Sequence, residues 1–197
     1  MKKIVFATKN QGKLKEIREI LGKKYQVVSM EEAGIDIDVE ENGTTFEENA
    51  IKKAEAVMKI CNEIVLADDS GLEVDYLNKE PGIYSARYMG EDTPYSVKNQ
   101  TIIDKLSGVE DEKRTARFVC AVACAIPGKY TLIVQETMEG IIGHEPAGEN
   151  GFGYDPIFYL PEYGKTSAQL TMEEKNKISH RGKALRAMAQ RIKKLPG

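Results

Sequence analysis

Residues 3–21 read KIVFATKNQGKLKEIREIL, which is a strand pattern followed directly by a helix pattern. Lys3–Ala7 is a short apolar run rich in strand formers. Gly12–Leu21 then carries apolar residues at helical spacing, and Gly22 predicts the end of that helix. The apolar stripe consists of Leu14, Ile17, Ile20 and Leu21. A strand that passes through a short polar loop into a helix is typical of an α/β fold.

The rest of the chain continues this alternation and then departs from it. The same patterns predict strands at Gln26–Met30, Ile64–Ala67, Thr115–Ile126 and Tyr130–Glu139, and helices at Phe46–Cys61, Tyr95–Leu106 and Ser179–Leu195. The last two strands flank Pro127-Gly128-Lys129 and read as an antiparallel hairpin. We therefore expect a mixed α/β sheet, in a single domain over residues 1–197.

Composition excludes several classes of protein. The chain has 197 residues, 41% of them hydrophobic, and a net charge of −3, which is ordinary for a globular domain. Its longest apolar run, Phe118–Ile126, is far shorter than the roughly 20 residues of a membrane span, and the apolar stretch after Met1-Lys2-Lys3 is too short for a signal peptide. The three cysteines form no C-x-x-C pair, which favours buried thiols over a disulfide framework or a zinc site. We expect a cytoplasmic protein with no membrane anchor.

Charge is distributed unevenly along the chain. Residues 30–50 carry eight acidic side chains and no basic one, whereas residues 171–197 carry eight basic side chains against two acidic ones. Two interpretations stay open: both segments are solvated surfaces, or the acidic one holds a cation and the basic one faces a polyanion.

The loop Thr8-Lys9-Asn10-Gln11-Gly12-Lys13 lies between the first strand and the first helix. A helix start presents unpaired N–H groups and the positive end of the helix dipole, and two lysines flank it here, which suits a phosphate group. An ordinary polar connection is the alternative. The chain has no G-x-x-x-x-G-K-[ST] sequence, so this loop is not a P-loop.

The segment Asp68-Asp69-Ser70-Gly71 is predicted to follow directly on the strand at Ile64–Ala67. Adjacent carboxylates supply the oxygen ligands that Mg²⁺ prefers, and a carboxylate can also take a proton from water. The alternative is an acidic turn in which aspartate caps a local backbone N–H group.

Two further segments carry side chains suited to a nucleobase. Gly148–Pro156 places three glycines around two aromatic residues and a carboxylate, so that a flat ligand can approach the backbone. Ser179 is a suitable N-cap for the last helix, which puts His180 and Arg181 in its first turn, where their donors can read a ring carbonyl. The alternatives are a turn whose aromatic residues plug a core and, for His180 taken singly, a surface histidine.

These segments together carry a resemblance to a known family. The blocks, in order, are Thr8-x-Asn10-x-x-Lys13, Thr45-Phe46-x-Glu48-Asn49-Ala50, Ala67-Asp68-Asp69-Ser70-Gly71-Leu72, Pro81-Gly82-Ile83-Tyr84-Ser85-Ala86-Arg87, Gly151-Phe152-Gly153-Tyr154-Asp155-Pro156 and Ser179-His180-Arg181. With these blocks spread over most of its length, the chain resembles the inosine/xanthosine triphosphate pyrophosphatase family.

The resemblance implies a fold, an activity and partners. The fold would be an elongated mixed β-sheet flanked by helices, with two lobes and a central nucleotide-binding cleft, in a homodimer. The activity would be Mg²⁺-dependent hydrolysis of ITP, dITP and XTP to the nucleoside monophosphate and pyrophosphate. The substrate would be a small molecule, with no stable nucleic-acid partner and no membrane.

The resemblance also implies roles for individual residues. Asp69 would accept the proton of the water that attacks the α-phosphorus, and would hold Mg²⁺ together with Glu40. Glu41 is the alternative second ligand, although the spacing to Gly43 favours Glu40. The residues implied to bind substrate are Thr8, Lys9, Asn10, Gln11, Gly12, Lys13 and Ser70 at the phosphates, Phe152, Gly153, Tyr154 and Asp155 at the base, and Lys175, His180 and Arg181 at both. Of these, Phe152 would stack on the base, and His180 and Arg181 would lie near the 6-oxo group.

Two other functions remain to be considered. A pyrophosphatase for modified pyrimidine nucleotides is disfavoured by the loop of Phe152 and by Ser179-His180-Arg181. A nucleotide- or RNA-binding regulator without turnover is disfavoured by Asp68-Asp69, because carboxylates beside phosphates do not help a binder unless a metal intervenes.

Overall fold

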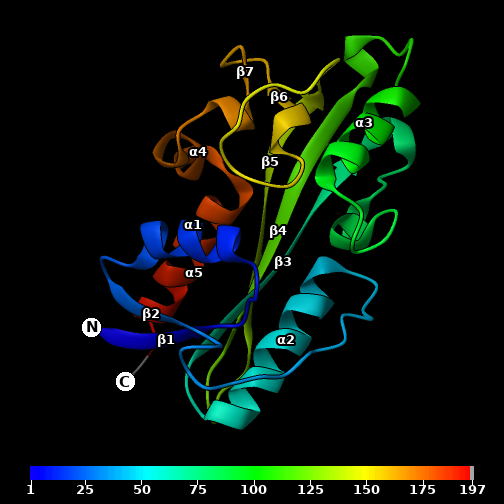
Figure 1. The fold of residues 1–197 in the computed structure, drawn as a ribbon. Coiled ribbons are helices and arrows are strands. Elements are labelled where there is room, and N and C mark those ends of the chain that lie inside the picture. Colours follow the sequence, from blue (N-terminus) through cyan, green and yellow to red (C-terminus); the bar gives the residue numbers. More distant parts are fainter. Residues whose placement is uncertain (196–197) are drawn as a thin grey trace. The chain divides into compact units, whose positions relative to one another are not determined.

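The computed structural model describes residues 1–195 as a mixed α/β fold (Figure 1). The seven strands are β1 (Lys2–Phe6), β2 (Tyr25–Ser29), β3 (Val65–Val74), β4 (Thr115–Ala125), β5 (Leu132–Ile142), β6 (Phe158–Leu160) and β7 (Lys165–Thr166). The α-helices are α1 (Gln11–Leu21), α2 (Phe46–Cys61), α3 (Tyr95–Lys105), α4 (Met172–Ile178) and α5 (His180–Lys193). Short 3₁₀ helices lie at Asp75–Leu77, Gly82–Arg87, Asp111–Lys113, Asp155–Ile157 and Ser167–Gln169.

The strands form one sheet in the order β2-β1-β3-β4-β5-β6-β7. Strand β1 pairs in parallel with β2 and with β3, whereas β6 pairs antiparallel with β5 and with β7. The predicted mixed α/β sheet is therefore confirmed. The predicted pair at 115–126 and 130–139 corresponds to the neighbouring strands β4 and β5, and the sequence prediction missed the short strands β6 and β7.

The first helix begins and ends where the sequence predicts, within one residue. Asn10 is its N-cap, and the Asn10 side chain accepts a hydrogen bond from the backbone N–H of Lys13 at 3.1 Å. Thr45 likewise caps α2 by accepting from the N–H of Glu48.

Strand β3 corrects one prediction. The sequence predicts a strand that ends at Ala67, but β3 continues to Val74, so Asp68-Asp69-Ser70-Gly71 lies inside a strand. Leu72 and Val74 are fully buried, and this burial extends the strand past the polar residues. Because side chains alternate along a strand, Asp68 and Asp69 point to opposite faces of the sheet.

The prediction near the C-terminus needs a second correction. The sequence prediction has one helix, Ser179–Leu195, whereas the structure has α4 before it and starts α5 at His180. A capping box at the start of α4 provides the missed signal, because Thr171 accepts from the N–H of Glu174 and the Glu174 side chain accepts from the N–H of Thr171.

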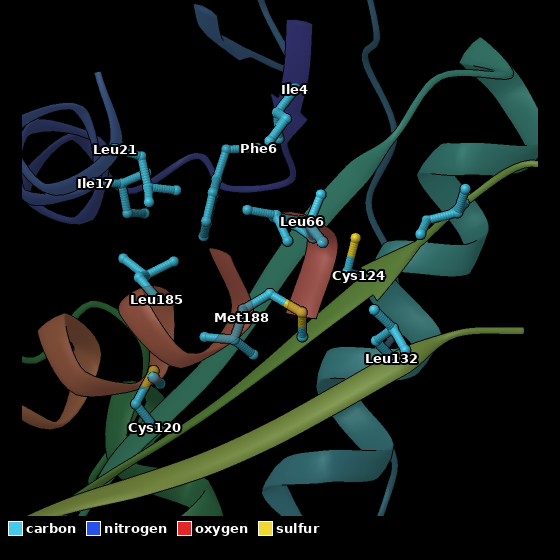
Figure 2. Packing of buried hydrophobic residues seen from close by; sticks show 14 residues of the cluster. Ile4, Phe6, Ile17, Leu21, Leu66, Cys120, Cys124, Leu132, Leu185 and Met188 are labelled. Atoms are coloured by element: carbon cyan, nitrogen blue, oxygen red, sulfur yellow. The ribbon is translucent and has the colours of Figure 1, made fainter. Parts of the chain in front are cut away.

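The chain divides into two compact units, neither of which is continuous in sequence. Unit 1 comprises residues 1–69, 120–136 and 180–197, and unit 2 comprises residues 70–119 and 137–179. The core of unit 1 is formed by residues of β1, β3, β4, α1 and α5, with Leu132 at the start of β5 (Figure 2). The core of unit 2 is formed by residues of β3, β4, β5, α3 and β6, with others from 154 to 170. No helix in the described part of the chain is long and apolar enough to cross a lipid bilayer.

The cysteines lie mainly in the core of unit 1. Cys120 and Cys124 are buried, whereas Cys61 is half-buried at the end of α2. None of the three, all of which lie in the described part, forms a disulfide. Burial raises the pKa of the Cys124 thiol to about 12, as expected of an unreactive structural thiol.

Arg114 is a buried cation that joins two elements of unit 2. Only 1% of it is exposed, and its guanidinium donates to the carbonyl oxygens of Leu106 at 2.7 Å, Ile142 at 2.8 Å and Gly143 at 2.8 Å. These bonds hold the end of α3 against the end of β5.

Replacing Arg114 with methionine should therefore destabilise the protein. Because the variant removes a donor from three carbonyl groups, of which that of Leu106 still accepts from the N–H of Val109 at 3.0 Å, we expect the free energy of unfolding to fall by about 2 kcal/mol or more. Urea denaturation measures this change, with the exposed neighbour Lys113→Met as control. A loss below about 1 kcal/mol would mean that water replaces the guanidinium at little cost.

Candidate active site

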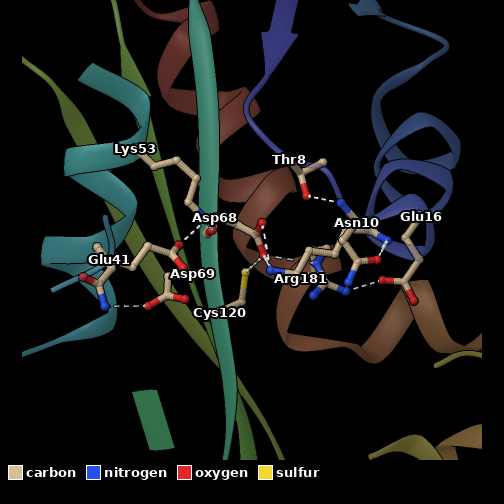
Figure 3. A network of polar contacts seen from close by, with 11 residues as sticks. Thr8, Asn10, Glu16, Glu41, Lys53, Asp68, Asp69, Cys120 and Arg181 are labelled. Carbon is tan, nitrogen blue, oxygen red and sulfur yellow. Dashed lines mark hydrogen bonds and ion pairs between the residues drawn. The ribbon is translucent and has the colours of Figure 1, made fainter. Parts of the chain in front are cut away.

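Asp68 and Asp69 stand at the centre of the polar groups in unit 1 (Figure 3). Asp68 is fully buried, and 8% of Asp69 is exposed. Their side chains leave β3 on opposite faces, so that Asp68 meets residues of α1 and α5 whereas Asp69 meets Asn49 of α2. Two adjacent carboxylates therefore have different surroundings.

Asp68 is held by two cations. Its Oδ2 lies 3.1 Å from Nζ of Lys13 and 3.4 Å from Nε of Arg181, and the thiol of Cys120 lies 3.9 Å from the same oxygen. Arg181 also forms an ion pair with Glu16, and only 2% of Arg181 and 3% of Glu16 are exposed. Burial alone would lower the pKa of Arg181, but the charges of Glu16 and Asp68 raise it above its ordinary value. This is a buried group of alternating charges, which orients Lys13 and Arg181.

The loop before α1 is arranged around the first turn of that helix. Thr8 Oγ1 accepts from the N–H of Asn10 at 3.1 Å, and Asn10 in turn caps the helix. The side chain of Lys13 is 17% exposed, while Nζ of the exposed Lys9 lies 2.6 Å from Asp38. The first turn of α1 also contains the other two predicted residues, Gln11 and Gly12. Residues 8–13 therefore combine a helix N-terminus with two lysines, as the sequence predicts.

The carboxyl group of Asp69 has a raised pKa. Its Oδ2 accepts from Nδ2 of Asn49 at 3.2 Å. Burial, and after it the negative charge of Glu41, raise the pKa of Asp69 to about 6 against the opposing effects of Lys13, Lys53 and Asn49. A carboxyl group tuned toward neutral pH is suited to accept a proton from water.

Glu41, rather than Glu40, faces this carboxyl group. The Glu41 carboxylate lies 2.5 Å from Nζ of Lys53 and contributes to the raised pKa of Asp69, whereas Glu40 is exposed. The geometry therefore favours Glu41 as the second metal ligand, whereas the spacing to Gly43 favours Glu40. Among the described residues no group of three or more His, Cys, Asp or Glu side chains is arranged to hold a metal. Glu41 and Asp69 are two carboxylates that interact electrostatically. The negative charge of Glu41 raises the pKa of Asp69, and a divalent cation between the two carboxylates would relieve this repulsion.

Lys53 and Asn49 are site residues that the sequence prediction missed. Nζ of Lys53 donates to the backbone carbonyl oxygen of Asp68 at 2.8 Å, in addition to its ion pair with Glu41. Burial alone would lower the pKa of Lys53, but Asp68 and Glu41 raise it. Both residues occupy the apolar stripe of α2, whose other members include Phe46, Ala50, Ala54 and Val57. A polar pair at positions i and i+4 inside an apolar stripe was the available signal.

In unit 2, Asp155 organises the predicted base-binding loop. It is 2% exposed; its Oδ2 accepts from the N–H of Phe152 at 3.0 Å and from Nζ of Lys175 at 2.7 Å, and its Oδ1 accepts from Ser167 at 2.7 Å. Nζ of Lys175 also lies 5.1 Å from the centre of the Phe152 ring. A side chain at Gly151 would meet Asp155 Oδ2 at 2.2 Å, so only glycine fits there. The loop is thus built around one buried carboxylate.

The remaining predicted residues fall into the two units separately. His180 is 4% exposed and begins α5 in unit 1, beside Arg181 in sequence. Ser70 is half-buried in β3 and is the first residue of unit 2. Tyr154 is buried, and its hydroxyl donates to the carbonyl oxygen of Ser85 at 2.6 Å. Unit 1 therefore brings together Thr8, Asn10, Lys13, Asp69 and Arg181, and unit 2 brings together Phe152, Asp155 and Lys175.

Fold and site define an α/β protein in which a helix N-terminus with two lysines and the carboxylates of Asp69 and Glu41 lie in one unit. The model of the Ham1 family matches residues 4–191, and the chain belongs to this family. A relative named dITP/XTP pyrophosphatase, from Bacillus subtilis, is 52% identical over 96% of this chain and 96% of its own length. Another of the same name, from Geobacillus kaustophilus, is 50% identical over 100% of this chain and 97% of its own. The resemblance drawn from the motifs is thereby confirmed.

Solved structures agree with this membership. The Ham1 protein of Staphylococcus aureus is 46% identical, covers 98% of each chain and superposes with a TM-score of 0.86. A HAM1 protein from Coxiella burnetii is 40% identical, covers 99% of this chain and 100% of its own, and superposes with a TM-score of 0.88.

Proposed function

We propose that this chain is a nucleoside triphosphate pyrophosphohydrolase that converts ITP, dITP and XTP to the monophosphate and pyrophosphate with Mg²⁺. The names of its relatives, dITP/XTP pyrophosphatase, support the reaction class and the substrates. The observation that carries the proposal is Asp69, a carboxyl group with a pKa near 6 beside a second carboxylate and two lysines. Such hydrolysis keeps deaminated purines out of DNA and RNA.

In this proposal Glu41 and Asp69 hold the metal. Bound Mg²⁺ would neutralise phosphate charge and favour ionisation of a water molecule. Asp69 accepts the proton of the water that attacks the α-phosphorus, and Asn49 fixes the orientation of its carboxyl group through Oδ2. With a pKa of about 6, Asp69 is largely ionised at neutral pH and still basic enough to take a proton.

The phosphates and the base are bound by different residues. The triphosphate binds residues 8–13, with the N–H groups of the first turn of α1, the charge of Lys13 and the hydroxyl of Ser70 as its donors. Phe152 stacks on the base, with Gly153, Tyr154 and Asp155 around it, and Lys175, His180 and Arg181 donate to the nucleotide. Adenine has an amino group where hypoxanthine has a carbonyl, so donors at this position reject ATP.

In this proposal the protein is a homodimer in the cytoplasm. It acts on a small-molecule substrate and has no stable nucleic-acid partner. Size-exclusion chromatography with light scattering checks the dimer.

A single assay tests the activity. Purified protein is incubated with ITP, dITP, XTP or ATP, with Mg²⁺ or with a chelator, and the released pyrophosphate and monophosphate are measured. We expect both products from ITP, dITP and XTP but not from ATP, which lacks the 6-oxo group, and only with metal. Release of orthophosphate instead of pyrophosphate, or equal rates with ATP, would contradict the proposal.

The metal assignment gives a separate prediction. Glu41→Gln should raise the Mg²⁺ concentration required for half-maximal activity by about 10- to 100-fold, because it removes a ligand charge. The same change should move the acidic limb of the pH profile to lower pH, since Glu41 raises the pKa of Asp69. Glu40→Gln is the matched comparison. If it shifts the Mg²⁺ requirement more than Glu41→Gln does, Glu40 is the ligand.

A further inference from the structure

Helix α3 packs against the loop that carries Phe152 in unit 2. The Tyr95 ring meets the Tyr154 ring edge-on, with centres 5.2 Å apart and planes at 89°. One turn further along the helix, Nδ2 of Asn99 donates to the carbonyl oxygen of Gly153 at 3.1 Å. None of these α3 residues is implied by the family motifs as a site residue.

Asn99 holds this carbonyl at a cost. It is 4% exposed, and its Oδ1 is buried without a hydrogen-bond partner among the described residues. The reversed amide would place two carbonyl oxygens against each other, so the chemistry fixes which end faces Gly153. A buried acceptor without a partner is unfavourable, and an apolar residue at this position would avoid that penalty.

The bond to Asn99 sets the direction of a neighbouring donor. The peptide group between Gly153 and Tyr154 is trans, so its C=O and N–H point in opposite directions. Because the carbonyl points to α3, the N–H of Tyr154 points away from it. This N–H donates no hydrogen bond within residues 1–195. The Tyr154 hydroxyl is already engaged with Ser85, which leaves the backbone N–H as the donor that Tyr154 can offer a ligand.

We propose that Asn99 is a specificity-determining positioning residue: it holds the Gly153 carbonyl so that the N–H of Tyr154 donates to the oxo group of a 6-oxopurine. This inference rests on the proposed function and adds a residue outside the predicted site. Adenine presents an amino donor at the same place, so ATP gains nothing from the alignment. Asn99 itself touches no substrate.

The test compares two neighbouring variants on one helix. Asn99→Leu removes the donor but keeps the branched shape and the number of heavy atoms, and Gln100→Leu, on the exposed face, removes only a bond to Asp104. For Asn99→Leu we expect kcat/KM for ITP to fall about three- to tenfold through KM, with kcat/KM for ATP unchanged. Gln100→Leu should leave both unchanged. Pyrophosphate release from ITP by the wild type tests the proposed function separately.

Binding measurements separate positioning from loss of folding. By calorimetry, the Kd of inosine monophosphate should rise by the same three- to tenfold factor in Asn99→Leu, while the Kd of pyrophosphate stays constant. Asn99→Ala, which adds no volume, is measured in the same way and should agree. An unchanged ITP/ATP ratio, an equal loss for both nucleotides, or weaker pyrophosphate binding would each overturn the inference, because a purely structural role affects all ligands alike.

Discussion

Replacing Asp69 with asparagine is expected to remove nearly all pyrophosphate release from ITP and, at the same time, to stabilise the protein in the presence of a chelator. The loss of activity should be about a thousandfold or more, because one change deletes both the proposed proton acceptor and a ligand charge. Steady-state release of pyrophosphate at saturating Mg²⁺ measures it. Activity within about tenfold of the wild type would remove Asp69 from the mechanism.

The expected stabilisation follows from the pKa of Asp69. Folding raises that pKa from 3.8 to about 6, so the folded state binds the proton more tightly than the unfolded state does. The free energy of unfolding therefore falls by about 3 kcal/mol as the pH rises from about 4 to 6, and it stays lower by this amount at higher pH. Asparagine carries no charge and escapes this loss.

Denaturation with a chelator at about pH 8 and about pH 4 separates the two states of Asp69. The stabilisation by Asp69→Asn should be present at the higher pH and vanish at the lower one. Asp68→Asn is the matched control and should have the opposite sign, since Lys13 and Arg181 lose the carboxylate that pairs with them. A destabilised Asp69→Asn at the higher pH would contradict this account.

Arg181→Ala should give the largest loss of stability in unit 1. The variant leaves two buried carboxylates, Glu16 and Asp68, without their shared guanidinium. Breaking a buried ion pair in this way typically costs about 3–5 kcal/mol. Urea denaturation measures the loss, and Arg186→Ala, at an exposed position of α5, is the control. A loss under about 1 kcal/mol would mean that the carboxylates are solvated or protonated without penalty.

A second substitution of Arg181 tests whether this residue recognises the base. Arg181→Lys keeps a positive charge between Glu16 and Asp68 but cannot reproduce the planar set of donors. If Arg181 donates to the 6-oxo group, the ITP/ATP ratio of kcat/KM should fall about ten- to a hundredfold, since ATP has no acceptor there. Equal losses for the two nucleotides would assign Arg181 to the phosphates or to structure. Because Arg181 also forms buried ion pairs with Glu16 and Asp68, the kinetics of Arg181→Lys are compared only after the variant has been shown to be folded.

Local sequence patterns predicted most helices and strands of this fold. They worked for β1, α1 and α2, where apolar spacing and capping residues agree with the final packing. They failed at β3, because the burial of Leu72 and Val74, which depends on distant parts of the chain, extends the strand through four polar or small residues. They missed α4, although its capping box was visible in the sequence.

The candidate site residues were predicted from residue types and motifs, whereas their contacts with one another came only from the structure. Motifs indicated Asp69, Lys13 and residues 8–13, yet spacing favoured Glu40, because distance along a loop does not tell which neighbouring side chain turns inward. Lys53 was missed because its role depends on the approach of α2 to β3. The base-pocket role predicted for Asp155 stays a prediction, although its hydrogen bonds in unit 2 all go to the surrounding chain.

The alternation of Asp68 and Asp69 also limits how this chain can change in length. Inserting or deleting one residue just before Asp68 would exchange the faces of the two carboxylates. Both residues are aspartates, so each face would still receive a carboxylate, but every later side chain of β3 would change face as well. The buried Leu72 and Val74 would leave their face of the sheet, and Glu73 would enter it. A point substitution acts on one position, whereas a one-residue insertion or deletion displaces the whole second half of the strand. Tolerated insertions and deletions should therefore fall in connections such as residues 126–131, between β4 and β5.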